Sequence, residues 1–320
     1  MNTPILLITF NRPNHTRRTL EALMAQSPRE VYVFQDGARS SHDGDKINCP
    51  LVREVIDEFV HRYSNCIFHT HYSEQNRGCR DAIIFAISSV LKEHESIIVV
   101  EDDIITSPAF LSYMNKALDY YKDCKTVHSV SGYSPSPSHF TIPKSYDYDV
   151  YASPRLFGWG WGTWRDRWEK VDWSMSYYED FMKHPEEIKA FNRGGDDMVR
   201  MLVDEKMGRS SAWDVQFVFD QFKKHMVSIV PTISYTANIG CDGSGTHCNA
   251  YSVNVGYDKL NKKSDVKLLD NLYFDSEIIN RLHSVFVYKK RPIWQKACNW
   301  IARKLECEVP YQVKSAVYAR

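Results

Sequence analysis

The first 130 residues alternate short apolar runs with longer segments whose apolar positions recur at helical spacing. The apolar runs predict strands at 5–10, 31–34, 66–71, 97–100 and 127–131. The longer segments predict helices at 15–25, 51–63, 80–92 and 108–121. Such alternation is typical of an α/β domain in which helices flank a mixed, mostly parallel sheet of the Rossmann-like kind.

The pattern changes after residue 131. Residues 132–180 are rich in Tyr, Trp, Ser, Pro and Gly, which predicts irregular functional loops rather than core. Further helices are predicted at 178–191, 198–207 and 213–225, followed by a strand at 227–230 and a Gly-rich loop at 240–247.

An acidic triplet is the sharpest chemical feature. Glu101, Asp102 and Asp103 directly follow a continuously apolar strand, and ligands bind at the carboxyl ends of strands in open parallel sheets. Adjacent carboxylates repel one another unless a cation or a set of donors compensates, and oxygen ligands suit Mg²⁺ or Mn²⁺. A solvated acidic turn leading into the next helix is the alternative, and the triplet alone leaves both open.

Composition narrows the class of protein. The 40 basic and 40 acidic residues cancel, which argues against a nucleic-acid partner. No apolar run reaches the roughly 18 residues that span a bilayer, and basic residues follow the first apolar run where a signal peptide would have its cleavage site. The eight cysteines contain no C-x-x-C pair. We therefore expect reduced thiols and a cytoplasmic location.

The neutral total hides an uneven distribution. Residues 281–320 contain nine basic and two acidic residues, so the rest of the chain has a net charge of −7. Trp294, Ala297, Ile301 and Leu305 recur at helical spacing between the basic residues. This basic amphipathic pattern predicts either an element that docks on a membrane surface or on a partner, or a helix packed on the main domain.

The order of short motifs resembles that of glycosyltransferases with the GT-A fold. The motifs are Asn11-Arg12-Pro13, Gln35-Asp36-Gly37, Asn76-Arg77-Gly78 and Glu101-Asp102-Asp103. The Glu-Asp-Asp form of the Asp-x-Asp motif most resembles the N-acetylglucosaminyltransferase I group of inverting, metal-dependent enzymes. The resemblance covers roughly residues 1–250. It implies a nucleotide-sugar donor, of the UDP type, and bound Mn²⁺ or Mg²⁺.

The resemblance also implies roles for individual residues. Asp103 would coordinate the metal that bridges the donor diphosphate. The residues that would bind the nucleotide-sugar are Asn11, Arg12, Asp36, Arg77, Glu101 and Asp102. From the residues alone, Arg12 and Arg77 could equally be surface cations or partners of carboxylates, and Asp36-Gly37 a tight turn.

Asp214 is the candidate general base. It opens a predicted helix beside Trp213, and an apolar neighbourhood raises a carboxylate pKa toward values useful in catalysis. A helix N-terminus also stabilises a carboxylate without any catalytic role. In the N-acetylglucosaminyltransferase I group a Trp-Asp motif carries the base. This sequence matches the motif but has Gln216 where an aromatic residue is typical.

Glycines alternate with tryptophans in residues 154–164. Bare backbone beside flat indoles suits the faces of sugar rings, and the resemblance implies that such a segment lines the donor-sugar and acceptor site. We therefore assign Trp159, Trp161 and Trp213 to sugar or acceptor binding. A Gly-rich bend with tryptophans buried as core anchors is the alternative.

The Gly-rich loop at 240–247 is a candidate for the diphosphate. Backbone N–H groups around Gly243 and Ser244 can wrap phosphates, and the resemblance implies a loop that orders over the nucleotide. His247 is a candidate second metal ligand or phosphate donor, although a lone histidine is more often neither.

The leading hypothesis is a metal-assisted, inverting glycosyltransferase. It would transfer sugar to a hydroxyl of a glycan or a lipid-linked glycan, near the inner face of a membrane. Residues 1–270 would form the GT-A domain, with 1–131 binding the nucleotide and 132–270 the acceptor, and 271–320 a basic extension. A sugar-nucleotide pyrophosphorylase is one alternative, although those enzymes have a Gly-rich loop where Asn11-Arg12-Pro13 stands. A non-catalytic carbohydrate-binding protein is the other.

Overall fold

The structure is a computed structural model that describes residues 2–240, 242 and 259–287, and the statements below concern these residues. Its strands are β1 (Ile5–Thr9), β2 (Glu30–Gln35), β3 (Ile67–Tyr72), β4 (Ser96–Glu101), β5 (Ile104–Thr106), β6 (Val127–Ser131), β7 (Val150–Ser153), β8 (Trp161–Trp164), β9 (Val227–Pro231) and β10 (Thr236–Asn238). Its helices are α1 (Pro13–Met24), α2 (Asp43–Arg62), α3 (Cys79–Leu91), α4 (Phe110–Tyr121), α5 (Arg165–Trp168), α6 (Tyr178–Phe181), α7 (Pro185–Phe191), α8 (Met198–Lys206), α9 (Trp213–Lys223), α10 (Ser276–Val285) and the 3₁₀ helix η1 (Asn192–Gly194).

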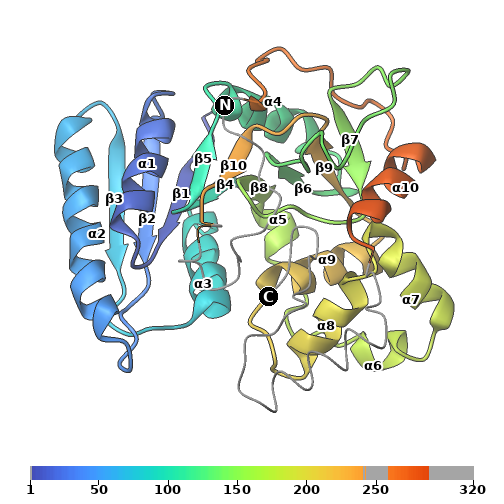
Figure 1. Ribbon diagram of the computed structural model, residues 1–320, viewed down its shortest axis with the longest axis horizontal. Coiled ribbons are helices and arrows are strands. Elements are labelled where there is room, and N and C mark those ends of the chain that lie inside the picture. Colours follow the sequence, from blue (N-terminus) through green and yellow to red (C-terminus); the bar gives the residue numbers. More distant parts are fainter. Residues whose placement is uncertain (1, 241, 243–258, 288–320) are drawn as a thin grey trace, which may run out of the picture.

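Eight of the described strands form one sheet in the order β3-β2-β1-β4-β8-β6-β9-β7, and β10 pairs with β5 in a small second sheet (Figure 1). Neighbouring strands from β3 to β4 are parallel, whereas β8 runs antiparallel to both β4 and β6, and β7 antiparallel to β9. This confirms the predicted mixed, mostly parallel sheet flanked by helices.

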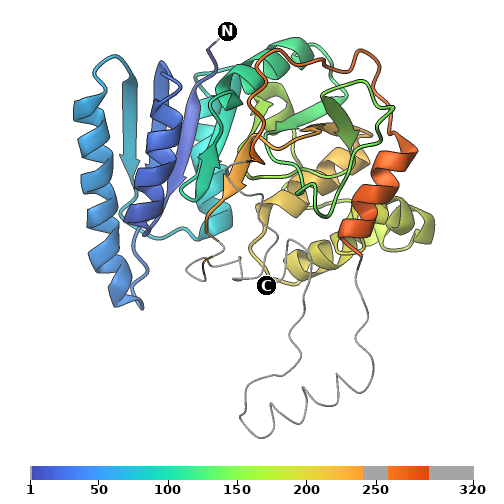
Figure 2. The same ribbon diagram turned by 45° about the horizontal axis from the view of Figure 1, so that its top comes forward.

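Helices cover both faces of the sheet. Alternate residues of a strand point to opposite faces, so Ile5 and Leu7 of β1 join one core while Leu6 joins the other. The first core holds apolar residues of α1, α2, α4 and α10, and the second holds those of α3, α8 and α9. In Figures 1 and 2, α2 lies at one end of the molecule and α10 at the other.

The predicted strands and helices of the first 131 residues are confirmed to within about two residues, with one exception. Helix α2 begins at Asp43, eight residues before the predicted start at residue 51. Pro50 lies inside the helix, and its usual role as a helix breaker hid the preceding two turns. In the second half, the predicted helix at 178–191 is two helices, because Pro185 starts a new one at α7.

The prediction that residues 132–180 form loops rather than core is wrong. Strands β7 and β8 lie in this segment, and all their residues are buried. Glycine is required in β8 because a Cβ at Gly162 would lie 2.7 Å from the carbonyl oxygen of Ile97. The Gly and Trp content therefore reflects close packing of a central strand.

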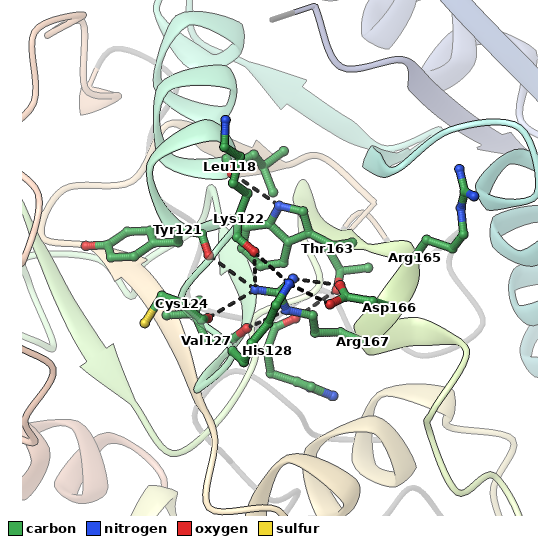
Figure 3. A network of polar contacts seen from close by, with 12 residues as sticks. Leu118, Tyr121, Lys122, Cys124, Val127, His128, Thr163, Arg165, Asp166 and Arg167 are labelled. Carbon is green, nitrogen blue, oxygen red and sulfur yellow. Dashed lines mark hydrogen bonds and ion pairs between the residues drawn. The ribbon is translucent and has the colours of Figure 1, made fainter.

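A buried arginine fastens this segment to the rest of the sheet. Figure 3 shows the guanidinium of Arg167, in α5, among backbone carbonyl groups. It donates hydrogen bonds to the carbonyl oxygens of Tyr121, Lys122, Cys124 and Val127. Arg167 thereby satisfies the carbonyl groups that follow the end of α4 and joins α5 to β6.

The last described segment packs on the main body. Asp275 caps α10 by accepting hydrogen bonds from two backbone N–H groups, and Ile278, Ile279 and Leu282 are buried in the first core. Arg281 donates to the carbonyl oxygen of Thr141 at 2.9 Å. Residues before and after the expected boundary at residue 270 therefore contribute side chains to the same core. Residues 288–320, with Trp294, lie outside the described residues.

Two further observations concern the described residues alone. None of their helices combines the length and the apolar character needed to cross a membrane. Their cysteines, Cys49, Cys66, Cys79 and Cys124, are free thiols.

Candidate active site

The acidic triplet forms the turn between β4 and β5. Glu101 is the last residue of β4 and is partly buried, while Asp102 and Asp103 are only 3% and 8% exposed. The carbonyl oxygen of Asp102 accepts a hydrogen bond from the Thr19 hydroxyl at 2.8 Å, and that of Asp103 from the Ile239 N–H at 2.8 Å. Helix α1 and the chain after β10 therefore hold the triplet from two directions.

Arg12 is the cation that faces the triplet. It directly precedes α1, and its guanidinium pairs with Asp102 and with Asp103, the latter at 3.0 Å. The N–H of Phe10 also donates to the Asp102 carboxylate at 3.3 Å. Burial opposes the charge on Arg12, but the two aspartates raise its pKa overall. The carboxyl ends of β1 and β4 are thus joined by an ionic link.

Negative charge at the triplet remains undercompensated. Burial, followed by repulsion from Asp103 and Asp102, raises the pKa of Glu101 to about 8. Burial also raises the pKa of Asp102 to about 6, although Arg12 opposes the shift. A divalent cation or a further set of donors would stabilise the ionised forms.

Gly240 closes the site beside Asp103. A Cβ at this position would lie 2.1 Å from Oδ2 of Asp103 and 2.8 Å from Nη1 of Arg12, so only glycine fits without displacing the ion pair. Two residues later, Asp242 lies 3.3 Å from Nε2 of His15. The predicted loop residues Gly243, Ser244 and His247 lie outside the described residues.

Asp36 organises the loop before α3. Its carboxylate accepts hydrogen bonds from the N–H groups of Gly37, Arg77 and Gly78, and from the Asn76 side chain at 2.9 Å. Burial raises its pKa despite these donors. Asp36, directly after β2, therefore positions the loop between β3 and α3, and its carboxylate oxygens accept hydrogen bonds from that loop.

Asn11 follows β1, and Arg77 lies in the loop between β3 and α3. Asn11 donates to the Asp45 carboxylate at 2.6 Å, and Arg39 also donates to it at 2.6 Å. The guanidinium of Arg77 lies over the ring of Phe85, 4.0 Å from its centroid. The side chain of Asn11 thus anchors α2, while exposed Arg77 is held in place by stacking.

Cys79 connects the triplet to the candidate base, and sequence reasoning overlooked it. It is the first residue of α3 and is accessible to solvent. Local desolvation, then the charges of Glu101, Asp214, Asp36 and Asp103, raise its pKa to about 12. A helix N-terminus normally lowers a thiol pKa, so desolvation and the nearby carboxylates together outweigh that effect here. The Asn76-Arg77-Gly78 motif directly before it was the available signal.

Asp214 lies in the first turn of α9 and is partly buried. Its carboxylate accepts the Val215 N–H at 2.9 Å. Its charge contributes to the raised pKa values of both Cys79 and Glu101, so the helix brings Asp214 toward the end of β4. Glu101, from the first half of the chain, and Asp214, from the second, therefore both raise the pKa of the Cys79 thiol.

The tryptophans differ from the expectation of an exposed sugar platform. Trp161 is fully buried and stacks on Trp213 at 4.9 Å between ring centroids, so it does not line the site. Trp159 packs against Tyr133 in the opposite core, because Gly160 has φ of +76° and breaks the extended alternation. Trp159 and Trp213 are 7% and 6% exposed, which leaves them edge contacts only.

Comparison with known proteins identifies one family. The sequence profile of the GNT-I family matches residues 1–227. A search of curated protein sequences finds no match.

Two solved structures are similar at low identity. One is the mannosyltransferase PcManGT from Pyrobaculum calidifontis in complex with GDP-Man and Mn²⁺, at 17% identity and a TM-score of 0.39, over 53% of this chain and 46% of that one. The other is UDP-glucose pyrophosphorylase complexed with UDP-glucose, at 10% identity and a TM-score of 0.38, over 75% and 94%. This chain spans about half the length of the mannosyltransferase.

Proposed function

The chain belongs to the GNT-I family and is a glycosyltransferase of the GT-A fold, and we propose that it transfers sugar from a UDP-sugar to a glycan hydroxyl with inversion. The acceptor is a free or lipid-linked glycan. The observation that supports this proposal is the buried pair Asp102 and Asp103 at the carboxyl end of β4, which Arg12 joins to the end of β1. Asp214, from the other half of the chain, contributes to the raised pKa of the neighbouring Glu101.

The donor occupies the carboxyl ends of β1, β2 and β4. Glu101 and Asp102 face the nucleoside and its ribose, and Asn11, with the loop that Asp36 organises, frames the base. Arg77 lies beside that loop, where its stacked guanidinium can reach a phosphate or the uracil.

Asp103 is the residue that would hold Mn²⁺ or Mg²⁺. The fit rests on hard oxygen ligands at a site whose carboxylates are undercompensated, with the pKa of Glu101 raised to about 8. No group of three or more metal-binding side chains occurs among the described residues, so phosphate oxygens and water complete the shell in this proposal. Bound there, the cation stabilises negative charge on the departing diphosphate.

Asp214 acts as general base. It accepts the proton of the acceptor hydroxyl while that oxygen attacks the anomeric carbon from the side opposite the diphosphate. The bond between the anomeric carbon and the diphosphate breaks, and Arg12 offsets part of the charge that develops on the leaving group. Trp213 directly precedes the base, and its ring packs against the Gly-rich segment, 3.5 Å from the position of a Cβ at Gly158.

Thermal stabilisation tests the donor side. A ligand that binds only the folded state raises the melting temperature by mass action. We expect UDP-sugars to stabilise the wild-type enzyme only with Mn²⁺ or Mg²⁺, and Asp103→Asn to lose that dependence. A carbohydrate-binding protein would instead bind glycan without nucleotide or metal, and a pyrophosphorylase would release UTP from UDP-sugar and pyrophosphate.

Transfer assays test the base. Asp214→Asn should keep metal-dependent UDP binding and lose about 100- to 10,000-fold in transfer rate, the usual contribution of a general base. Asp43→Asn is the control, since this carboxylate is 93% exposed at the start of α2. Wild-type transfer rates in Asp214→Asn would overturn the assignment of the base.

A further inference from the structure

A bridge of polar contacts, formed by Arg80, Gln216 and Glu205, connects the two halves of the molecule near the candidate base. Arg80 lies in the first turn of α3, and its Nε donates to Oε1 of Gln216 in α9 at 2.7 Å. The same Nε lies 3.5 Å from Oε1 of Glu205 in α8. Figure 1 shows these three helices on one side of the sheet. One guanidinium therefore ties the helix that begins at the donor site to two helices of the acceptor half.

The far ends of the bridge are fixed to the backbone around Asp214. Glu205 accepts the N–H of Ala212, two residues before Asp214, at 2.7 Å. Gln216, two residues after Asp214, donates its amide to the carbonyl oxygen of Trp173 at 3.1 Å. Both side chains are buried, at 8% and 2% exposure. The base therefore lies between two buried anchor points that share one arginine.

The same N-terminal end of α3 is also fixed to the donor side. Asp36 holds the N–H groups of Arg77 and Gly78 directly before Cys79, and Arg80 follows one residue later. A continuous set of contacts thus runs from the end of β2 through α3 to the residues on either side of Asp214. A rigid connection of this kind fixes the separation between donor and base.

We infer that Arg80 and Gln216 are positioning residues that set the distance between Asp214 and the donor. This inference rests on the proposed function of Asp214. It gives Gln216 a role at the position where an aromatic residue is typical of the family, because the ring of a phenylalanine or a tryptophan could not accept a hydrogen bond from Arg80. Neither residue is assigned contact with the substrate.

The test is a double-mutant cycle with Arg80→Met and Gln216→Met, which keep side-chain length and remove the hydrogen bond. We expect each single variant to lower kcat about 10- to 100-fold, the range caused by displacement of a catalytic group by about 1 Å. The KM for the donor and the Kd for UDP with Mn²⁺ should change less than about twofold. The double variant should lose less than the two single losses combined, since both substitutions remove the hydrogen bond between Arg80 and Gln216.

A control variant and a milder substitution distinguish loss of the Arg80–Gln216 contact from a general loss of stability. Arg209→Gln removes a neighbouring ion pair, in which an arginine that is 53% exposed lies 2.9 Å from Asp204, and should leave kcat unchanged. Gln216→Asn shortens the bridge without inserting an apolar group; its kcat should fall while its melting temperature stays close to that of the wild type.

Three results would overturn the inference: wild-type kcat in both Gln216 variants, losses that add in the double variant, or losses that follow UDP affinity or melting temperature. Failure of the proposed function looks different. If the wild-type enzyme itself transfers no sugar from any UDP-sugar, the function is wrong; wild-type transfer with unimpaired variants defeats only the bridge.

Discussion

Gly240 shows how tightly a single residue is constrained at this site. The position of its missing Cβ is 2.1 Å from Oδ2 of Asp103 and 2.8 Å from Nη1 of Arg12. Any larger residue at position 240 would therefore clash with the ion pair between Arg12 and Asp103. The composition of the loop alone indicated only flexibility. The backbone N–H of Gly240 is held as well, donating to the Asn238 side chain at 2.7 Å.

Gly240→Ala should therefore damage donor binding more than folding. An added methyl group must displace Asp103 or Arg12, and the loss of one charge-assisted contact corresponds to about a tenfold weaker affinity or more. Calorimetry of UDP binding with Mn²⁺ measures the effect. Gly44→Ala is the matched control, because a Cβ there meets nothing within 4 Å and alanine favours the helix. If Gly240→Ala bound UDP with Mn²⁺ as tightly as the wild type, Gly240 would not be part of the donor site.

The residue types of the donor site could be predicted from sequence, but the role of each side chain could not. The acidic triplet and Asp36 follow strands, so their common location at one edge of the sheet follows from strand order. Whether a carboxylate faces a ligand or the chain itself depends on contacts between distant segments. Asp36 and Asn76 are 40 residues apart and bond to each other, which no local pattern reveals.

At the scale of elements, periodicity predicted the nucleotide half well because its strands are continuous apolar runs. Strand β8 was not predicted because Gly158, Gly160 and Gly162, before and within it, interrupt the apolar pattern. Those glycines allow close packing, with Gly162 against the backbone of β4 and against Leu118 and Met114 of α4. Trp159 and Trp161 likewise lie in opposite cores because Gly160, with a positive φ, interrupts the extended backbone between them, and composition does not reveal a positive φ.

The start of α2 depends on one buried ion pair. Asp45 is 1% exposed in the first turn of α2, and its bonds to Arg39, then to Asn11, lower its pKa to about 2. A carboxylate whose pKa is lower in the folded protein stabilises the fold above its ordinary pKa of about 4. That contribution is lost as the pH falls from about 4 to about 2.

Asp45→Asn should lower the free energy of unfolding by about 2 kcal/mol at pH 7, as the size of the pKa shift implies. The difference from wild type should shrink as the pH is lowered from 4 to 3. Urea unfolding at these three pH values measures it, with Asp43→Asn, exposed on the same helix, expected to differ little from wild type throughout. A difference that stays constant with pH would mean that geometry, rather than the charge of Asp45, stabilises α2.

At the scale of the whole molecule, charge is divided between body and tail. Of the nine basic residues in 281–320, only Arg281 lies in the described residues, where it bonds to Thr141. Residues 288–320 hold the other eight and two acidic residues. We propose that this basic segment, with Trp294 and Trp300, holds the enzyme beside anionic lipid.

Two truncations separate this membrane role from folding. Removal of 288–320 keeps α10, whose buried Ile278, Ile279 and Leu282 complete the first core. This variant should keep its melting temperature and its transfer to a soluble acceptor. It should no longer sediment with vesicles containing phosphatidylserine, and wild-type binding should weaken at high salt because the attraction is screened.

The second truncation, removal of 276–320, deletes α10 and should lower the free energy of unfolding by several kcal/mol through lost apolar burial. If the shorter truncation still bound the vesicles, the attachment would lie on the body, whose net charge of −7 before residue 281 opposes it.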